Sequence, residues 1–216
     1  MELPLFPLNT VLFPGGHLPL HIFEERYKLM IGRCITDRLP FGVCLIRKGT
    51  EAGPAAEPFA MGTTAHIRKV QKLEEGRLNV ACLGGQRFRI AEITQRSPYL
   101  AAEVEHVELP AETGEAVADL ARTVGDLFAE YVRLSLAMTN QWARSIETPA
   151  DPHGLADYVA GRLAADPLTR QRLLEQLSAT LRLQAEVELL TRAINMLRTR
   201  TVAAQTSRWL GFSVMN

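Results

Sequence analysis

The chain has 216 residues, of which 47% are hydrophobic and 22% charged, as in an ordinary globular protein with a sizeable core. Lys+Arg and Asp+Glu both number 24, so no overall charge draws the chain to nucleic acid or to an anionic membrane. No uninterrupted apolar run reaches the ~18 residues that a membrane-spanning helix needs. The composition predicts a soluble protein of one or two domains.

The first segment, MELPLFPLNTVLFPGGHLPLHIFEERY, is strongly apolar and is interrupted by prolines. A cleaved signal peptide would need a basic start and an unbroken apolar region, but this chain carries Glu2 and prolines at positions 4, 7 and 14. We therefore expect the segment to remain in the protein. Prolines lack a ladder donor and confine a strand to an edge or a bent path, while Gly15-Gly16 would allow a reversal.

One helix is predicted next. In EERYKLMIGRCITDRL the apolar side chains recur every three or four residues and form one stripe, at Tyr27, Met30, Ile31, Cys34 and Ile35. FGVCLIRKG follows as an almost continuous apolar run, which favours a buried strand.

The following segments alternate between apolar and polar residues, as strands with one buried face do. RLNVACLGG places Leu78, Val80 and Cys82 on one face and Arg77, Asn79 and Ala81 on the other; QRFRIAEI and YLAAEVEHVEL continue as strands. Residues 74–76, Glu-Glu-Gly, are expected to form a hairpin turn, and Gly84-Gly85 a second turn or a bulge.

The three cysteines, Cys34, Cys44 and Cys82, lie singly within apolar runs, and no C-x-x-C pair occurs. This pattern predicts buried thiols in a reducing compartment rather than disulfides or zinc ligands. We expect a cytoplasmic protein.

After residue 110 the period becomes helical. Apolar residues step by three and four without a miss, at Val117, Leu120, Val124, Leu127, Tyr131, Leu134 and Met138. A long final helix over residues 168–201 is expected to pack antiparallel on this first helix, which begins near Thr113. Between them, Thr148, Asp151 and Asp166 each precede a proline, as an N-cap would, so short helices are expected to begin there.

The segment LPLFPLNTVLFPGGHLPLHIFEERYKLM resembles the opening of the LON N-terminal domain, the substrate-recognition domain of Lon ATP-dependent proteases. FGVCLI, GTTAHIRKV, LEEGRLNVACLGGQRFRI and PYLAAEVE resemble later blocks of that family in the same order, and DPHGLADYVAGRL followed by RQRLLEQL resembles its helical bundle. The resemblance implies an α+β fold. A PUA-like six-stranded β-barrel with one crossing helix would occupy residues 1–110, and an α-helical bundle with an apolar C-terminal tail would occupy residues 111–216.

That tail, SRWLGFSVMN, carries large apolar side chains that are costly to leave in water, at Trp209, Leu210, Phe212, Val214 and Met215. We expect it to dock on an apolar surface of this chain or of another.

Full Lon proteases also carry a motor domain and a protease domain, which would not fit in the remaining residues. RKGT has the wrong order for a phosphate-binding loop, LGGQR lacks the lysine, and no serine lies in a motif like that of the family's serine–lysine protease site. His17 and His21 are separated by Pro19, which argues against the helix that would make them a metal pair. We expect a protein that is not an enzyme, with no cofactor and no metal.

The first functional hypothesis is a non-catalytic module that binds apolar segments of client or partner proteins, alone or with a separate protease or ATPase. Its anchors would be large apolar residues near Gly15-Gly16, namely Phe13, Leu18, Phe23 and Tyr27. Alternatively, all four belong to the core of the barrel. Their solvent exposure distinguishes the two interpretations.

The second hypothesis is RNA binding, which the PUA-like resemblance suggests. An outward row of arginines would contact phosphates, at Arg77, Arg87 and Arg89, with Arg68 beside them. Glutamates on the same and adjoining strands favour cross-strand ion pairs instead, so nucleic acid ranks below protein as a partner.

Overall fold

The computed structural model describes the backbone of residues 1–51 and 56–212 and the side chains of residues 1–51 and 56–200. The chain divides into two compact units. The barrel unit comprises Met1–Pro110 and Ala160–Leu177, and the helical unit comprises Ala111–Val159 and Ser178–Asn216. A segment from the second half of the chain thus clusters with the strands.

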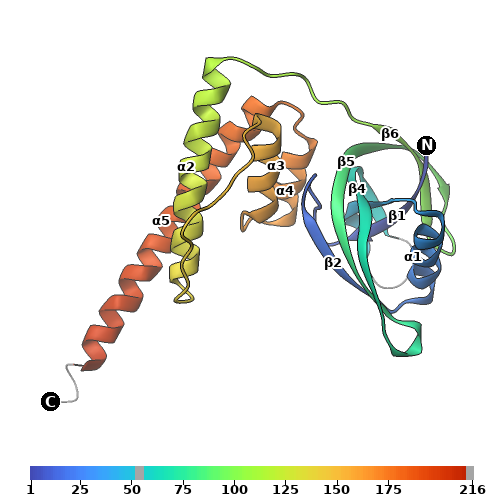
Figure 1. Cartoon of the computed structure of the whole chain (residues 1–216), viewed down its shortest axis with the longest axis horizontal. Coiled ribbons are helices and arrows are strands. Elements are labelled where there is room, and N and C mark those ends of the chain that lie inside the picture. Colours follow the sequence, from blue (N-terminus) through green and yellow to red (C-terminus); the bar gives the residue numbers. More distant parts are fainter. Residues whose placement is uncertain (52–55, 213–216) are drawn as a thin grey trace. The chain divides into compact units, whose positions relative to one another are not determined.

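Among its described residues, the barrel unit contains six strands (Figure 1): β1 (Glu2–Leu8), β2 (His17–Ile22), β3 (Phe41–Lys48), β4 (Glu57–Lys72), β5 (Leu78–Gln95) and β6 (Leu100–His106). Their order is β2-β5-β4-β3-β1-β6, and β5 also pairs with β6, so the sheet curls into a nearly closed ring. β1 runs parallel to β3, and the other described pairings are antiparallel. The expected six-stranded barrel in an α+β fold is confirmed.

The long strand β5 changes partners along one edge, pairing with β2 over its first part and with β6 over its last. Gly84 lies between the two parts, where the register against β4 shifts. Its backbone exchanges hydrogen bonds with Gly15 (2.9 Å) and Gly16 (2.8 Å), and a Cβ at this position would come within 2.2 Å of the Phe13 carbonyl oxygen. The predicted irregularity is therefore confirmed, and its cause is close backbone approach.

Helix α1 (Glu25–Asp37) packs its apolar stripe into the barrel core. Met30, Ile31 and Cys34 are buried, and the ring of Tyr27 lies 4.0 Å from that of Phe6, centroid to centroid. Ile35 ends the stripe outside the core, because it is 39% exposed.

The three cysteines are free and buried, as predicted. Burial raises the pKa of Cys34 and of Cys82 to about 11, and raises that of Cys44 further. The thiol is therefore the stable form of each near neutral pH.

Helix α4 (Pro167–Glu175) belongs to the barrel unit and is joined to it by polar side chains. Arg87 Nε donates to the Leu174 carbonyl (3.0 Å), and Gln171 Nε2 donates to the Met61 carbonyl (3.1 Å). Arg170 Nη2 donates to the Val11 carbonyl at 3.0 Å. These bonds, together with buried apolar side chains of the helix, explain why α4 clusters with the strands.

The helical unit contains α2 (Glu115–Ala137), most of α3 (Pro152–Arg162) and α5 (Ala179–Phe212). Glu112, just before α2, accepts hydrogen bonds from the first amides of α5, at 2.6 Å from Ala179 and 3.0 Å from Thr180. Further along both helices, Arg198 pairs with Glu130 at 2.5 Å. The start of α2 thus lies beside the start of α5, and a later residue of α2 lies beside a later residue of α5, so the two helices run parallel. The antiparallel packing expected from the sequence is wrong.

The connection after α2 explains the parallel arrangement. It runs back along that helix, since Ile146, Pro149 and Ala150 line one hollow together with Gly114 and Val117 near the start of α2. The chain then enters α3, so a later helix can start again at the same end.

The expected single helix over residues 168–201 is two helices, since α4 ends at Glu175 and α5 begins at Ala179. Helices begin after Asp151 and Asp166 as predicted, and the Asp166 carboxylate accepts from Thr169 N at 3.0 Å. No helix begins after Thr148. The side chains of the apolar tail, including Trp209, lie outside the described residues.

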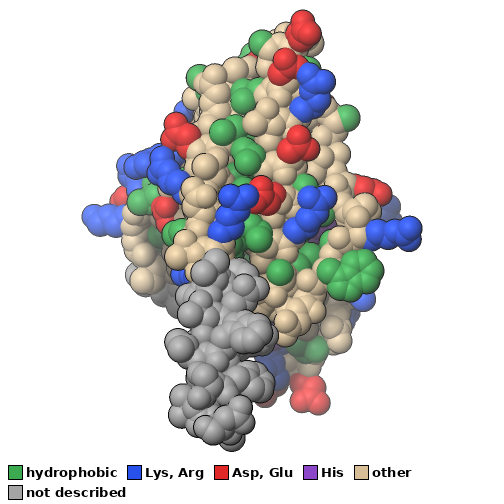
Figure 2. All heavy atoms as spheres, turned by 90° about the vertical axis from the view of Figure 1, so that its left-hand side faces the viewer, with side chains coloured by type: hydrophobic (Ala, Val, Ile, Leu, Met, Phe, Trp, Pro, Cys, Tyr) green, Lys and Arg blue, Asp and Glu red, His purple; other side chains and the backbone are tan. Residues whose placement is uncertain are grey.

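Across the described residues, no helix is both long enough and apolar enough to cross a membrane. Figure 2 looks onto the helical unit and shows Lys/Arg and Asp/Glu side chains interspersed on that face. Phosphate binding would require a broad area of positive charge, and that face presents none.

Candidate functional site

The outer face of β2, β5 and β4 carries two rows of three side chains. The strand register places His21, Asn79 and Gln71 in one row. Pro19, Ala81 and Lys69 form the next row. Each strand alternates its side chains between the core and this face, so Leu18, Leu20 and Ile22 pack toward the core while these rows face outward.

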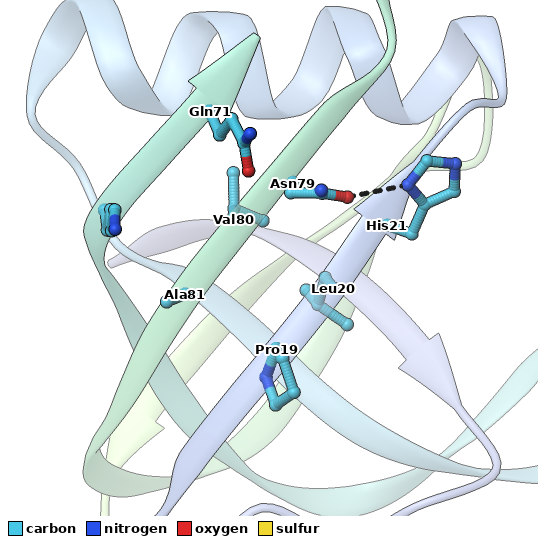
Figure 3. Close-up of a pocket in the computed structure, with 8 residues that line it drawn as sticks. Pro19, Leu20, His21, Gln71, Asn79, Val80 and Ala81 are labelled. Atoms are coloured by element: carbon cyan, nitrogen blue, oxygen red, sulfur yellow. Dashed lines mark hydrogen bonds between the residues drawn. The ribbon is translucent and has the colours of Figure 1, made fainter. Parts of the chain in front are cut away.

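A shallow hollow of about 440 Å³ lies over these rows (Figure 3). We call it the outer hollow; its lining is Pro19, Leu20, His21, Lys69, Gln71, Asn79, Val80 and Ala81. Ala81 lies in the middle strand between Pro19 and Lys69, and its methyl group leaves room that a larger side chain would fill. The hollow can therefore accommodate an apolar side chain, with polar groups around it.

The rim of the hollow is held by a polar contact. His21 Nδ1 lies 2.7 Å from Asn79 Oδ1, which accepts the hydrogen bond when that ring nitrogen carries the proton. Phe23 follows directly after β2, and its ring stacks beside His21 with centroids 6.0 Å apart. Phe23 is 57% exposed, so a large apolar ring stands in solvent at the edge of the hollow.

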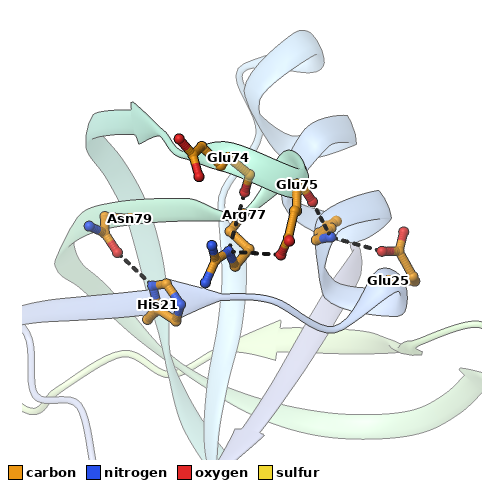
Figure 4. Close-up of polar contacts among 7 residues, drawn as sticks. His21, Glu25, Glu74, Glu75, Arg77 and Asn79 are labelled. Carbon is orange, nitrogen blue, oxygen red and sulfur yellow. Dashed lines mark hydrogen bonds and ion pairs between the residues drawn. The ribbon is translucent and has the colours of Figure 1, made fainter.

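The adjoining hairpin turn is fixed by ion pairs and by bonds to its backbone (Figure 4). Lys28 of α1 bonds to Glu25 (2.8 Å) and to the Glu75 carbonyl (2.8 Å). Arg77 donates to the Glu74 carbonyl at 3.2 Å and lies 3.6 Å from the Glu75 carboxylate. The turn that joins β4 to β5 is thus tied to α1, which steadies the end of the outer hollow formed by Gln71 and Asn79.

The four apolar residues predicted as anchors lie in different environments. Phe13 (1% exposed) and Tyr27 (6%) are buried, and Leu18 is half-buried against the core. Only Phe23 of the four is largely exposed. The core interpretation therefore holds for Phe13 and Tyr27, while Phe23 has the exposure that an anchor would need.

The predicted outward arginine row is not formed. Arg87 is 3% exposed and bonds to α4, so the prediction that it faces outward is wrong. The alternation inverts there because the bulge at Gly84 shifts the register of β5 against β4. Arg77 pairs with Glu75 of the hairpin turn. Arg68 and Arg89 are exposed, but the four arginines do not form a continuous row.

The outer hollow itself was not predicted as a site. The alternation in RLNVACLGG correctly placed Asn79 and Ala81 on the outward face, but it could not show that β2 would supply Pro19 and His21 beside them. Among the residues whose positions are described, no group of His, Cys, Asp or Glu could hold a metal ion.

A family model described as the ATP-dependent protease La (LON) substrate-binding domain matches residues 2–192. The chain is 31% identical over 199 residues to Lon protease of Anaeromyxobacter dehalogenans and 26% identical over 204 residues to Lon protease of Escherichia coli. These matches cover 91% and 92% of this chain but only 24% and 26% of those proteins. The chain thus spans about a quarter of the length of these curated relatives.

Two solved structures share the fold. The crystal structure of a Lon N-terminal domain protein from Xanthomonas campestris is 27% identical, with a TM-score of 0.63, over 86% of this chain and 96% of that one. The N-terminal domain of Mycobacterium avium complex Lon protease is 20% identical, with a TM-score of 0.65, over 88% of this chain and 98% of that one. At that identity the second likeness concerns the fold alone.

Proposed function

The chain belongs to the LON substrate-binding domain family, and we propose that it is a non-catalytic module that binds exposed apolar segments of other proteins at the outer hollow. The observation that carries the proposal is the ring of Phe23, which is 57% exposed at the rim of a hollow lined by Pro19 and Ala81. Aromatic anchors beside small pockets supply much of the energy at protein interfaces.

The chemistry of the hollow suits an extended segment with spaced apolar residues. One apolar side chain would cover Ala81, and another would pack on the Phe23 ring. The amides of Gln71 and Asn79 can hydrogen-bond the backbone of the segment, because each offers both a donor and an acceptor. Such contacts do not depend on one client sequence.

The test uses fluorescently labelled casein, a largely unfolded protein, as the probe. Phe23→Ala removes the ring, and Ala81→Arg fills the hollow at an exposed position where the fold can tolerate a larger side chain. We expect each to weaken binding by about tenfold, the equivalent of about 1.4 kcal/mol. The matched control is Leu29→Ala, because Leu29 is 58% exposed on α1 and does not line the hollow.

Equal casein affinity in the wild type and in both site variants would reject the outer hollow as the binding surface. Equal losses in Leu29→Ala and Phe23→Ala would instead indicate nonspecific adhesion to exposed apolar groups.

We further propose that the chain hydrolyses neither ATP nor peptides and passes its clients to a separate protease or ATPase. The family model that matches is that of the substrate-binding domain, and the nucleotide-binding and protease motifs are absent from the sequence. The purified chain should leave casein intact and release no phosphate from ATP. Cleavage that a substitution of one of its own serines abolished would contradict this.

A further inference from the structure

A second apolar surface lies in the barrel unit, in a groove between the end of α1 and β4. This α1–β4 groove is lined by Cys34, Ile35, Arg38, Leu39, His66, Ile67, Arg68 and Val70, and its volume is about 400 Å³. It shares no lining residue with the outer hollow, to which β4 contributes Lys69 and Gln71 instead.

The walls of the groove leave aliphatic side chains in water. Leu39 is 51% exposed and Ile35 is 39% exposed, while Ile67 and Val70 of β4 are only partly buried against the core. A ligand that covered these groups would remove apolar surface from water at roughly 25 cal/mol per Å².

The backbone at the end of α1 fixes one wall of the groove. Arg38 closes the helix in the left-handed conformation (φ 53°), and the Leu39 amide donates to the Cys34 carbonyl at 3.0 Å. This backbone turn fixes the directions in which Arg38 and Leu39 leave the helix. The groove is therefore formed before any ligand arrives, which lowers the entropic cost of binding.

Two guanidinium groups of the groove have no carboxylate partner. Neither Arg38 nor Arg68 forms an ion pair with any residue in the described part of the chain, and the nearest acidic neighbour along α1, Asp37, is paired with Arg33 at 3.6 Å. Elsewhere in the barrel unit, arginines do pair with carboxylates, as Arg26, Arg47 and Arg77 show. The groove thus combines exposed aliphatic walls with uncompensated positive charge.

We propose that the α1–β4 groove binds a protein segment in which aliphatic residues are flanked by carboxylates. The aliphatic residues cover Ile35, Leu39, Ile67 and Val70, and the carboxylates pair with the two arginines. Charge complementarity decides the occupant, because guanidinium groups form bidentate pairs with carboxylates. Single-stranded RNA fits less well, since its bases stack on aromatic rings and the groove is lined by aliphatic side chains with the imidazole of His66 as its one aromatic ring.

The test measures fluorescence anisotropy of labelled peptides added to the full chain. The acidic probe has three leucines flanked by glutamates, and the basic probe has the same leucines flanked by lysines. We expect the wild type to bind the acidic probe at least about tenfold more tightly than the basic one, a preference that weakens as salt is added. A charge-reversed double variant, Arg38→Glu with Arg68→Glu, should exchange the two preferences.

The matched control is Lys48→Glu with Arg89→Glu, which changes the net charge equally at exposed positions outside the groove. It should keep the wild-type preference. Because the double reversal is expected to gain affinity for the basic probe, a loss of folding cannot imitate the result.

Three outcomes would overturn the proposal: equal affinity of the wild type for both probes, an unchanged preference in the double variant, or the same change in the control. Tighter binding of labelled single-stranded RNA than of the acidic probe, abolished by the double variant, would assign the groove to nucleic acid instead. Loss of casein binding in Phe23→Ala concerns the outer hollow alone, so the two proposals succeed or fail separately.

Discussion

Three polar side chains of the barrel unit donate to backbone carbonyl groups, whereas the buried polar side chains of the helical unit are charged groups that lie near one another. In the barrel unit, Arg87, Arg170 and Gln171 each donate to a carbonyl oxygen of a segment that is distant in the sequence. A carbonyl is neutral at every pH, so the acceptors of these three bonds, which join α4 to the rest of the barrel unit, do not titrate.

In the helical unit the corresponding groups are charged. Arg182 is fully buried and bonds to Asp157 of α3, and it also donates to His153 Nδ1 at 2.6 Å. One turn further along α5, Glu186 is fully buried, and neither of its carboxylate oxygens has a hydrogen-bond partner. Burial raises the pKa of Glu186 to about 9, although Arg182 opposes the shift.

The two units therefore differ in how their stability responds to pH. Bonds to neutral carbonyls make the attachment of α4 insensitive to pH, while a buried carboxyl ties the stability of the helical unit to its protonation. Four substitutions test this contrast, and hydrogen–deuterium exchange follows each unit separately.

The largest effect is expected from Arg182→Met. It leaves the buried Asp157 without its cation, and breaking a buried ion pair from one side typically costs about 3–5 kcal/mol. Amides of α2 and α5 should exchange much faster, while those of β4 and β5 change little. The control Arg192→Met removes an exposed cation from the same helix and should alter exchange only slightly. Equal effects of the two substitutions would show that burial of the pair is unimportant.

Glu186→Gln should stabilise the helical unit at neutral pH. The pKa of Glu186 is higher in the folded than in the unfolded chain. Where the carboxyl is ionised in the unfolded chain, it must take up a proton on folding, which lowers the free energy of unfolding. Wild-type stability should fall as the pH rises from about 4.5 toward about 9, by at most on the order of 3 kcal/mol at pH 7. The variant should lack this decline, so the two proteins converge near pH 4.

Urea titrations at pH 5 and pH 8 measure that difference. Parallel declines in the wild type and Glu186→Gln would contradict a neutral buried carboxyl, and a decline seen equally in the exchange of β4 would remove the contrast between the units.

In the barrel unit, Arg87→Met should loosen α4. The substitution keeps apolar volume but leaves the Leu174 carbonyl without its donor, at a cost of about 1–3 kcal/mol. Amides of α4 should exchange faster to the same extent at pH 6 and pH 8. Arg89→Met, at an exposed position of the same strand, is the control. A strong pH dependence of the loss would mean that this attachment also involves a titrating group.

The smallest effect is expected from Glu112→Gln. Hydrogen bonds from Thr180, Ala179 and Ser178 hold the pKa of Glu112 at about 2, so its stabilising effect is present above about pH 4.5 and is lost as the pH falls toward 2. Because the carboxylate is partly exposed, we expect only about 1 kcal/mol, as for other helix caps. The first turn of α5 should exchange faster at pH 6, and Glu147→Gln, an exposed glutamate without a described partner, should leave it unchanged. No change in Glu112→Gln would contradict the capping role.

Features set by local sequence could be predicted, whereas features set by the pairing of distant segments could not. The alternation of Leu78, Val80 and Cys82 with Asn79 and Ala81 predicted which side chains of β5 face the core, because strand sterics set that period locally. Blocks such as FGVCLI and GTTAHIRKV indicate the family from the sequence alone. The outer hollow escaped prediction, because it exists only where β2 and β4 flank Ala81 in register.

Features with local signals were predictable from the sequence: the stripe of α1, the glycines at the β5 bend, the aspartate that caps α4, and the buried thiols. Three other features depend on tertiary contacts. Arg87 turned inward when a bulge displaced its register, α4 separated from α5 where Glu112 caps the new helix, and α5 ran parallel to α2 because the intervening chain turned back. Each depends on residues distant in the sequence, and the periodicity of one segment carries no information about its partners.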